Sequence, residues 1–292
     1  MNVVFFGSSS YVIPILEVLR KNFDLALVLT TEKNPADAVS TYCIKNKIPY
    51  LSVPTLSDLN LQSSIFNLQS SVAVLADFGL IIPTSVLNFF LHGIVNIHPS
   101  LLPKYRGPTP VQTAILNGEK ITGVSIIKLD EEIDHGPILG QEKEEILDTD
   151  TAESLYKKLF EKGANLLLKV LNSYLKDELK PIAQNHADAT FTQHLTRQDG
   201  YVDISKFETR NSKFELERKI RAYFPWPGTW SKLRLANCDV RIKFLPDQKL
   251  QVEGKKPMSY KDFANGYPDE AKNLQFISGL DKVNNESLRS PT

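Results

Sequence analysis

Short apolar runs alternate with longer segments of helical periodicity along the first half of the chain. The short runs are rich in β-branched and aromatic residues, which predicts strands at 3–6, 25–29, 72–76 and 94–98. Apolar residues recur at three- and four-residue spacing between them, which predicts helices at 13–19, 35–46, 83–90 and 109–116. Strands that alternate with helices build βαβ units. The pattern therefore predicts an α/β fold with a mostly parallel sheet.

The second half changes character after a long amphipathic helix predicted at 151–175, which follows two further strands at 124–129 and 138–145. Periodicity weakens from about residue 176, and we place a first domain at 1–187 and a linker at 188–204. A second domain at 205–292 starts with a helix at 214–224 and ends in a frayed polar tail. Its short strands, at 230–235, 240–245 and 250–252, predict a small β-barrel or sandwich.

Composition narrows the class of protein. The 292 residues are 42% apolar and 23% charged, which is typical of a globular protein. Two cysteines, Cys43 and Cys238, are too few for a disulfide framework, and no secretory signal or membrane-length apolar run is visible. We expect a cytoplasmic protein. Residues 205–262 carry 14 basic and 7 acidic side chains among several aromatics, which fits either a polyanion partner or a solvated basic surface.

Candidate chemistry concentrates at the end of the fourth predicted strand. Asn96 and His98 are two residues apart on an extended chain and should project from one face, where they can meet one ligand atom. Pro99 begins a proline-rich loop, which predicts a preorganised site at the carboxyl end of a strand. Asp134 lies in a loop between two later strands, and a carboxylate beside an imidazole orients it and favours its protonated form. A surface turn and a structural histidine remain the plain alternatives.

Three other kinds of site are weakly supported. The turn at residues 7–10 contains one glycine, whereas a dinucleotide fingerprint needs three and an acidic partner. His92, His98 and His135 lack a recognisable ligand spacing, so we expect no metal. Ser100 lacks the Gly-x-Ser-x-Gly elbow of a serine nucleophile.

The run Asn96-x-His98-x-Ser100-Leu101-Leu102-Pro103, followed by Asp134, resembles the signature of formyltransferases that use 10-formyltetrahydrofolate. The segment at 77–83, Asp-Phe-Gly-Leu-Ile-Ile-Pro, is similar to their folate-side segment. In the linker and the second domain, the segments 195–197, 217–222, 225–230 and 253–258 resemble the carboxyl-terminal domain of the methionyl-tRNA formyltransferase family. The likeness covers nearly the whole chain.

This resemblance implies a Rossmann-like formyltransferase domain followed by a small OB-like β-barrel that helps to hold tRNA. It implies a catalytic trio of Asn96, His98 and Asp134, with 10-formyltetrahydrofolate as co-substrate and initiator methionyl-tRNA as acceptor and partner. A small amine, such as an amino sugar or glycinamide ribonucleotide, and a noncatalytic folate or RNA-binding module are the alternatives. The implied folate-site residues are Ser100, Leu101, Leu102 and Pro103 together with Phe78, Gly79, Leu80, Ile81, Ile82 and Pro83.

Proteins bind the phosphates of tRNA with lysine and arginine side chains. We expect the protein to be a monomer and to have no membrane partner. The candidate contacts are Lys104, Arg106, Lys213, Arg218, Lys219 and Arg221. The family usually carries a basic, glycine-containing insertion after the second strand, whereas residues 30–35 here run straight on with a single lysine, Lys33.

Overall fold

The structure is a computed structural model that describes residues 2–31, 38–56, 72–206, 210–235, 238–272 and residue 274. The chain divides into two compact units, described here one at a time. The first comprises residues 1–110, 121–145 and 156–193, and the second comprises residues 111–120, 146–155 and 194–292. Each unit thus draws on segments that are far apart in the sequence.

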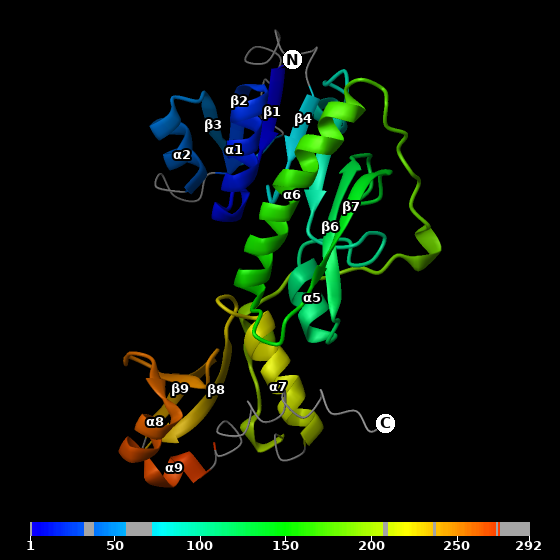
Figure 1. The fold of residues 1–292 in the computed structure, drawn as a ribbon. Helices are drawn as coiled ribbons and strands as arrows, with labels where there is room; N and C mark the ends of the chain where they lie inside the picture. Colours follow the sequence, from blue (N-terminus) through cyan, green and yellow to red (C-terminus); the bar gives the residue numbers. More distant parts are fainter. Residues whose placement is uncertain are drawn as a thin grey trace. The chain divides into compact units, whose positions relative to one another are not determined.

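A seven-stranded sheet forms the centre of the first unit, in the order β3-β2-β1-β4-β5-β6-β7 (Figure 1). The pairs among β3, β2, β1, β4 and β5 are parallel, whereas β6 pairs antiparallel with both β5 and β7. The prediction of a mostly parallel α/β sheet is confirmed. The strands are β1 (Asn2–Phe6), β2 (Asp24–Thr31), β3 (Tyr50–Val53), β4 (Val72–Leu75), β5 (Ile94–His98), β6 (Ile121–Lys128) and β7 (Ile138–Glu145).

The helices differ from the sequence prediction mainly at their ends. The structure has α1 (Ile13–Asn22), α2 (Ala38–Asn46), α4 (Thr84–Leu87), α5 (Pro110–Leu116) and α6 (Ala152–Tyr174). Residues 35–37 of the predicted second helix lie outside the described residues. The predicted helix at 83–90 is a single turn, because the backbone after Leu87 leaves the helix and Gly93 turns with φ +72° into β5. Strand β3 was missing from the prediction, since its four residues carry little periodicity.

Helix α6 crosses one face of the sheet (Figure 1), and its apolar residues share a core with Val95 and Ile97 of β5. At Gly163 the two elements approach so closely that an added Cβ atom would lie 2.9 Å from Ile97 Cγ2 and 3.1 Å from Val124 Cγ2. Ile97 is the residue between Asn96 and His98, and it is 1% exposed. The strand that carries Asn96 and His98 is therefore packed tightly against this helix, as expected of a close-packed core.

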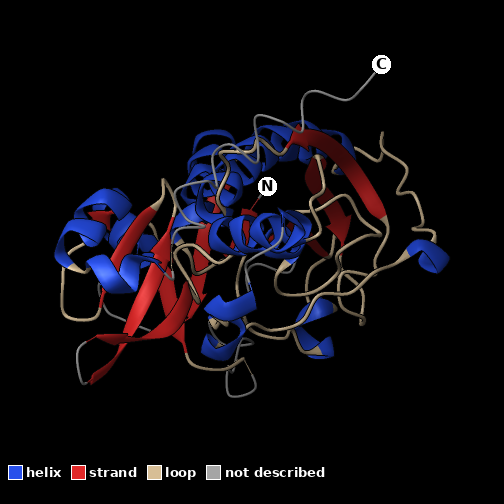
Figure 2. Cartoon of the chain, turned by 90° about the horizontal axis from the view of Figure 1, so that it is seen from below, coloured by secondary structure: helices blue, strands red, loops and turns tan. Residues whose placement is uncertain are grey.

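The second unit contains a four-stranded antiparallel sheet in the order β11-β10-β9-β8. Its strands are β8 (Thr229–Leu235), β9 (Cys238–Leu245), β10 (Lys249–Val252) and β11 (Met258–Ser259), and its other helices are α7 (Arg210–Ala222), α8 (Tyr260–Gly266) and α9 (Pro268–Lys272). Leu233, Ile242, Phe244 and Leu250 pack with Phe263 into one core, and Figure 2 shows helices against this sheet. The predicted strands are present, while β11, α8 and α9 were not foreseen. Within the described residues the strands form an open sheet.

The segment after α6 belongs structurally to the first unit up to residue 193. The backbones of Ile182 and Ile138 exchange two hydrogen bonds of 2.8 and 2.7 Å. Further along, the Arg106 amide donates to Thr190 and the Thr192 amide donates to Arg106, each at 2.8 Å. The first part of the predicted linker at 188–204 is thus hydrogen-bonded to the loop that follows β5.

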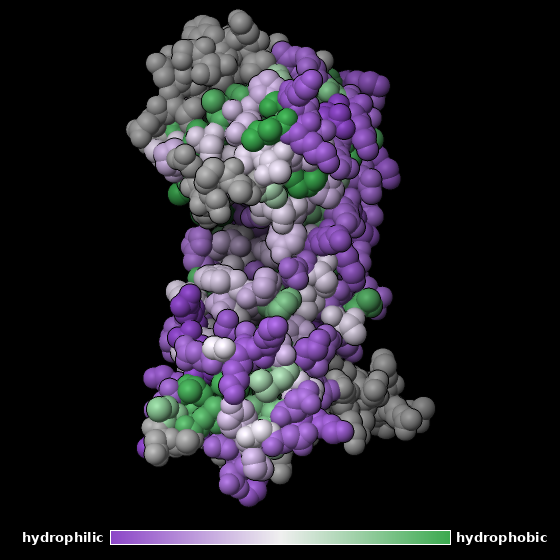
Figure 3. Space-filling view, turned by 90° about the vertical axis from the view of Figure 1, so that its left-hand side faces the viewer, coloured by the Kyte–Doolittle hydropathy of each residue, from purple (hydrophilic) through white to green (hydrophobic). Residues whose placement is uncertain are grey.

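Charged and polar residues cover much of the face shown in Figure 3, and hydrophobic residues form smaller groups between them. None of the described helices combines the length and apolar character that a membrane span requires.

Candidate functional site

Asn96, His98 and Asp134 meet at the end of β5. Asn96 Nδ2 donates a hydrogen bond of 3.1 Å to Asp134 Oδ1. His98 Nδ1 lies 3.5 Å from Asp134 Oδ2. Asn96 and His98 lie on one face of β5, as the spacing predicted, and they share the Asp134 carboxylate although 38 residues separate Asn96 from Asp134.

Local structure fixes each member of this trio. Asn96 and His98 are each 5% exposed, because β5 is an interior strand between β4 and β6. Asp134 lies in the turn between β6 and β7 with a φ of +50°, a conformation uncommon outside glycine. The Gly107 amide donates 2.8 Å to Asp134 Oδ2, which ties the loop after β5 to the same carboxylate.

The imidazole of His98 faces an acceptor at each nitrogen. Nε2 lies 2.9 Å from the Tyr105 carbonyl oxygen, and Nδ1 faces Asp134. A carbonyl oxygen can only accept, so Nε2 carries a hydrogen. A ring with a proton on both nitrogens can donate to both neighbours. Among the described residues, the Asn96 amide makes a single hydrogen bond, so its second N–H has no partner there.

Residues 100–103 form a rigid turn beside the trio. The Leu102-Pro103 peptide bond is cis. Ser100 Oγ donates to the Lys104 carbonyl oxygen at 2.7 Å. Ser125 Oγ donates to the Ser100 carbonyl and accepts from the Leu102 amide, while Gln141 Nε2 donates to the Leu102 carbonyl. Polar groups of two neighbouring strands thus fix the backbone of the predicted folate-site segment.

The second predicted folate-site segment follows β4. Phe78 is buried and its ring meets that of Phe6 edge-on at 5.3 Å. Ser8 Oγ donates 3.1 Å to the Phe78 carbonyl oxygen. Two positive φ angles, +44° at Asp77 and +77° at Gly79, then turn the chain outward, and Ile81 is 85% exposed. Phe78 therefore anchors a turn whose later residues are open to a ligand.

The structure distinguishes the two cations predicted to contact tRNA near Asn96, His98 and Asp134. Lys104 is exposed. Arg106 is 3% exposed and donates 2.7 Å to Gln184 Oε1, and its Nη2 also lies 2.8 Å from His186 Nδ1. A guanidinium buried in these contacts has no free face for a phosphate, so the predicted phosphate contact at Arg106 is replaced by a structural role inside the unit.

The four candidate cations of α7 in the second unit also differ. Arg221 forms a two-bond pair with Glu217 and donates 3.0 Å to the Asp150 carbonyl oxygen. Lys219 Nζ donates 3.1 Å to the Tyr201 carbonyl oxygen, and burial lowers the pKa of this lysine although the Asp199 carboxylate opposes the shift. Both side chains are therefore engaged within the unit. Lys213 and Arg218 are partly exposed and have no hydrogen-bond or ion-pair partner among the described residues.

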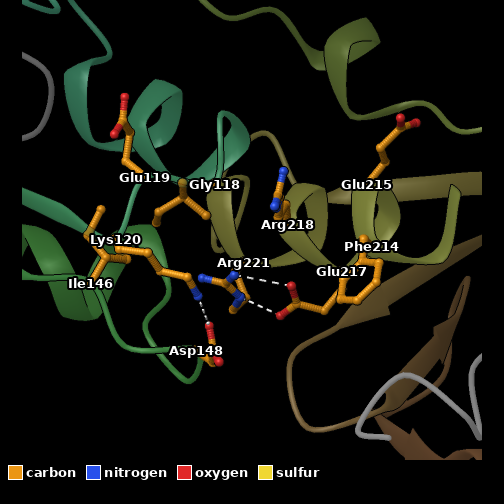
Figure 4. Close-up of a pocket in the computed structure, with 11 residues that line it drawn as sticks. Gly118, Glu119, Lys120, Ile146, Asp148, Phe214, Glu215, Glu217, Arg218 and Arg221 are labelled. Atoms are coloured by element: carbon orange, nitrogen blue, oxygen red, sulfur yellow. Dashed lines mark hydrogen bonds and ion pairs between the residues drawn. The ribbon is translucent and has the colours of Figure 1, made fainter. Parts of the chain in front are cut away.

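A cavity of about 350 Å³ lies beside Arg218 in the second unit (Figure 4). Figure 4 shows Arg221 and Glu217 directed toward each other on one side of it, and Lys120 directed toward Asp148, with Lys120 Nζ 2.9 Å from Asp148 Oδ1. The Arg218 guanidinium lies against Gly118, whose φ of +69° favours glycine. Arg218 therefore lines the cavity with a charge that has no ion-pair partner among the described residues.

Sequence reasoning missed the hydrogen bonds that hold the trio from outside. Gln184 donates to the backbone on both sides of His135, and the Tyr105 carbonyl and the Gly107 amide contact the trio directly. No periodic signal marks these residues, because main-chain groups carry no sequence information and Gln184 lies in an irregular segment. Among the described residues, no group of three or more His, Cys, Asp or Glu side chains could hold a metal ion.

Formyl transferases are found among the families, the relatives and the solved structures that the chain resembles. Residues 1–171 match the formyl transferase family. The chain is 39% identical over 240 residues to a methionyl-tRNA formyltransferase of Chloroflexus aurantiacus, which covers 79% of this chain and 76% of the relative. It is 37% identical over 256 residues to that of Roseiflexus castenholzii, covering 83% and 80%. The crystal structure of a sugar 3N-formyl transferase in the presence of dTDP and 5-N-formyl-THF has a TM-score of 0.62 and 21% identity, covering 88% of this chain and 99% of that chain.

Proposed function

Because the chain belongs to the formyl transferase family, and methionyl-tRNA formyltransferases are among its relatives over most of its length, we propose that it formylates methionyl-tRNA. The formyl donor is 10-formyltetrahydrofolate, and the acceptor is the α-amine of methionine on the initiator tRNA. The observation that carries this proposal is the convergence of Asn96 and His98 on the Asp134 carboxylate.

The trio suits a direct attack on the formyl carbon. The amine forms a bond to this carbon, and negative charge develops on the formyl oxygen. The free N–H of Asn96 donates to that oxygen, which is the kind of stabilisation that removes ~2.7 to 4 kcal/mol from a barrier. The bond to the folate nitrogen N10 then breaks. A water carries the proton that the amine loses to N10, giving formyl-methionyl-tRNA and tetrahydrofolate.

In this step, we propose that His98 supplies a second hydrogen bond to the formyl oxygen and that Asp134 orients His98 and Asn96. His98 Nε2 is hydrogen-bonded to the Tyr105 carbonyl, so this N–H reaches the substrate only by exchanging that partner. We propose that the formyl oxygen takes the carbonyl's place during the reaction. Asp134 keeps the ring oriented through Nδ1 and holds the Asn96 amide in line. No covalent enzyme intermediate is needed.

For the folate, we propose the two turns beside the trio. The fixed backbone of residues 100–103 and the outward turn at 78–83 supply backbone polar groups and apolar side chains, a combination typical of small-molecule sites. The co-substrate is therefore held by two segments, each of which follows a strand of the parallel part of the sheet.

For the tRNA, we propose Lys104 in the first unit and Lys213 and Arg218 in the second, because these cations are accessible. We further propose that the second unit is OB-like, on the basis of its antiparallel sheet and the sequence resemblance. The segment of the family's basic insertion, at 30–35, lies mostly outside the described residues. We place the reaction in the cytoplasm with a monomeric enzyme.

A direct assay tests the proposed function. Purified protein is mixed with 10-formyltetrahydrofolate and one of three acceptors: initiator methionyl-tRNA, a nucleotide-linked amino sugar, or glycinamide ribonucleotide. We expect formyl-methionine only on the tRNA, at a rate that falls as salt rises because phosphate contacts release counterions. Transfer to either small amine with none to the tRNA would overturn the proposal.

A further inference from the structure

After α6 the chain runs back to the turn that carries Asp134, and backbone hydrogen bonds fix its position there. The two backbone hydrogen bonds between Ile182 and Ile138 place residue 184 beside the turn that carries Asp134. Gln184 is 6% exposed, so its amide is removed from water and must find its partners inside the protein.

Both N–H groups of the Gln184 amide are used on the turn. Nε2 donates 2.9 Å to the Asp134 carbonyl oxygen and 2.7 Å to the Gly136 carbonyl oxygen. These carbonyls flank His135, so one side chain holds the backbone where Asp134 adopts its positive φ. A left-handed conformation of a residue other than glycine is maintained only where its surroundings enforce it.

Arg106 fixes which way the Gln184 amide faces. Arg106 Nη2 lies 2.7 Å from Gln184 Oε1, and a guanidinium has only donors to offer. The amide oxygen must therefore face Arg106, which leaves Nε2 directed at the two carbonyls. Arg106 is itself held by His186 at 2.8 Å and by the Phe191 ring, 5.9 Å from its Cζ atom.

Asp134 is thus held from two directions. Asn96 and Gly107 donate to its carboxylate, and Gln184 donates to its carbonyl. We propose that Gln184, oriented by Arg106, is a positioning residue for the reaction: it sets the backbone of Asp134 so that one carboxylate meets both Asn96 and His98. The inference rests on the proposed function, and it locates part of the catalytic geometry in a segment that follows the matched family region at 1–171.

The test uses the full chain with Gln184→Met, which keeps the length of the side chain and removes its hydrogen bonds. We expect kcat to fall at least tenfold, since small displacements of catalytic groups have large effects on rate. The KM for 10-formyltetrahydrofolate should stay within twofold, because Gln184 does not contact the proposed folate turns. Gln193→Met is the matched control: the same substitution at an exposed glutamine of the same segment, with kcat unchanged.

A double-mutant cycle with Asp134→Asn separates positioning from general damage. If Gln184 acts through Asp134, adding Gln184→Met to Asp134→Asn should lower kcat by less than twofold further. A full multiplicative loss in the double variant, or a Gln184→Met kcat within twofold of the wild type, would overturn the inference. Circular dichroism and a melting curve check the fold of each variant.

Gln184→Glu provides a second variant should the methionine variant fail to fold. It keeps an acceptor for Arg106 but faces the two carbonyls without donors, so kcat should again fall at least tenfold. Wild-type activity on methionyl-tRNA is measured in the same series. If the wild type uses another amine, the proposed function fails, while the kcat comparison on that amine still decides the role of Gln184.

Discussion

The cluster around Asp134 and helix α7 both gather polar side chains, but they use them in opposite ways. Around Asp134, four groups from three separate segments converge on one residue. Along α7, Lys219 and Arg221 are engaged within their own unit, while Lys213 and Arg218 keep their charges unpaired among the described residues. A cation's residue type and position therefore do not reveal its role; its hydrogen-bond partners do.

The largest expected effect is at the cluster around Asp134. Asn96→Ala removes both the donor proposed for the formyl oxygen and a partner of Asp134, so kcat/KM should fall about 10²- to 10³-fold. Folate binding, measured by fluorescence titration, should persist. Loss of folate binding together with activity would place Asn96 in ligand binding instead of catalysis.

Lys104 and Arg106 lie in one loop and allow the same comparison, between an exposed cation and a hydrogen-bonded one. Arg106→Ala leaves Gln184 Oε1 without its donor, so kcat should fall about tenfold through the displaced geometry. Lys104→Ala removes an exposed charge and should raise the KM for tRNA with kcat unchanged. Steady-state kinetics at two salt concentrations measure both. An Arg106 effect that vanishes at high salt would contradict the structural role.

Glu217→Gln tests the ion pair between Glu217 and Arg221 on α7. The variant leaves Arg221, whose side chain is 11% exposed, without its carboxylate. Breaking such a mostly buried pair should lower the free energy of unfolding by on the order of 2 kcal/mol. A thermal melt measures the loss. Lys272→Met, at an ion pair exposed on both sides, is the control and should leave the melting temperature unchanged.

Arg218→Ala tests a cation of α7 that is proposed to contact a tRNA phosphate. One lost phosphate contact should lower the slope of log affinity against log salt by about one. Tight tRNA binding with an unchanged slope would show that Arg218 serves only the Gly118 contact. Filter binding over a salt series gives the slope.

The smallest expected effect is at Asp199, beside Lys219. Hydrogen bonds from the Thr196 hydroxyl and amide lower the pKa of Asp199, so its ionised form stabilises the fold. That contribution is present above the ordinary carboxyl pKa, about pH 4, and is lost as the pH falls through the lowered value. Asp199→Ala should reduce the melting temperature slightly at pH 7, and the difference from the wild type should shrink below pH 4. A difference independent of pH would contradict this cause.

The sequence predicts the parts of the fold and site that have a local signal. Buried strands such as β1 and β5 are rich in apolar residues, and the two-residue spacing places Asn96 and His98 on one face of β5. The roles of Gln184 and Arg106 depend on hydrogen bonds spanning 48 to 80 residues, which no local pattern encodes. The four-residue β3, the two-residue β11 and the short helices α8 and α9 were also not predicted, because segments this short carry little periodicity.

The close approach at Gly163 has a practical consequence for redesign. Widening the range of acceptor amines invites substitutions around the front of β5. The back of the strand offers no slack, because a methyl group at position 163 would press on Ile97, which lies between Asn96 and His98. Redesign of this enzyme should therefore leave the helix crossing at Gly163 untouched.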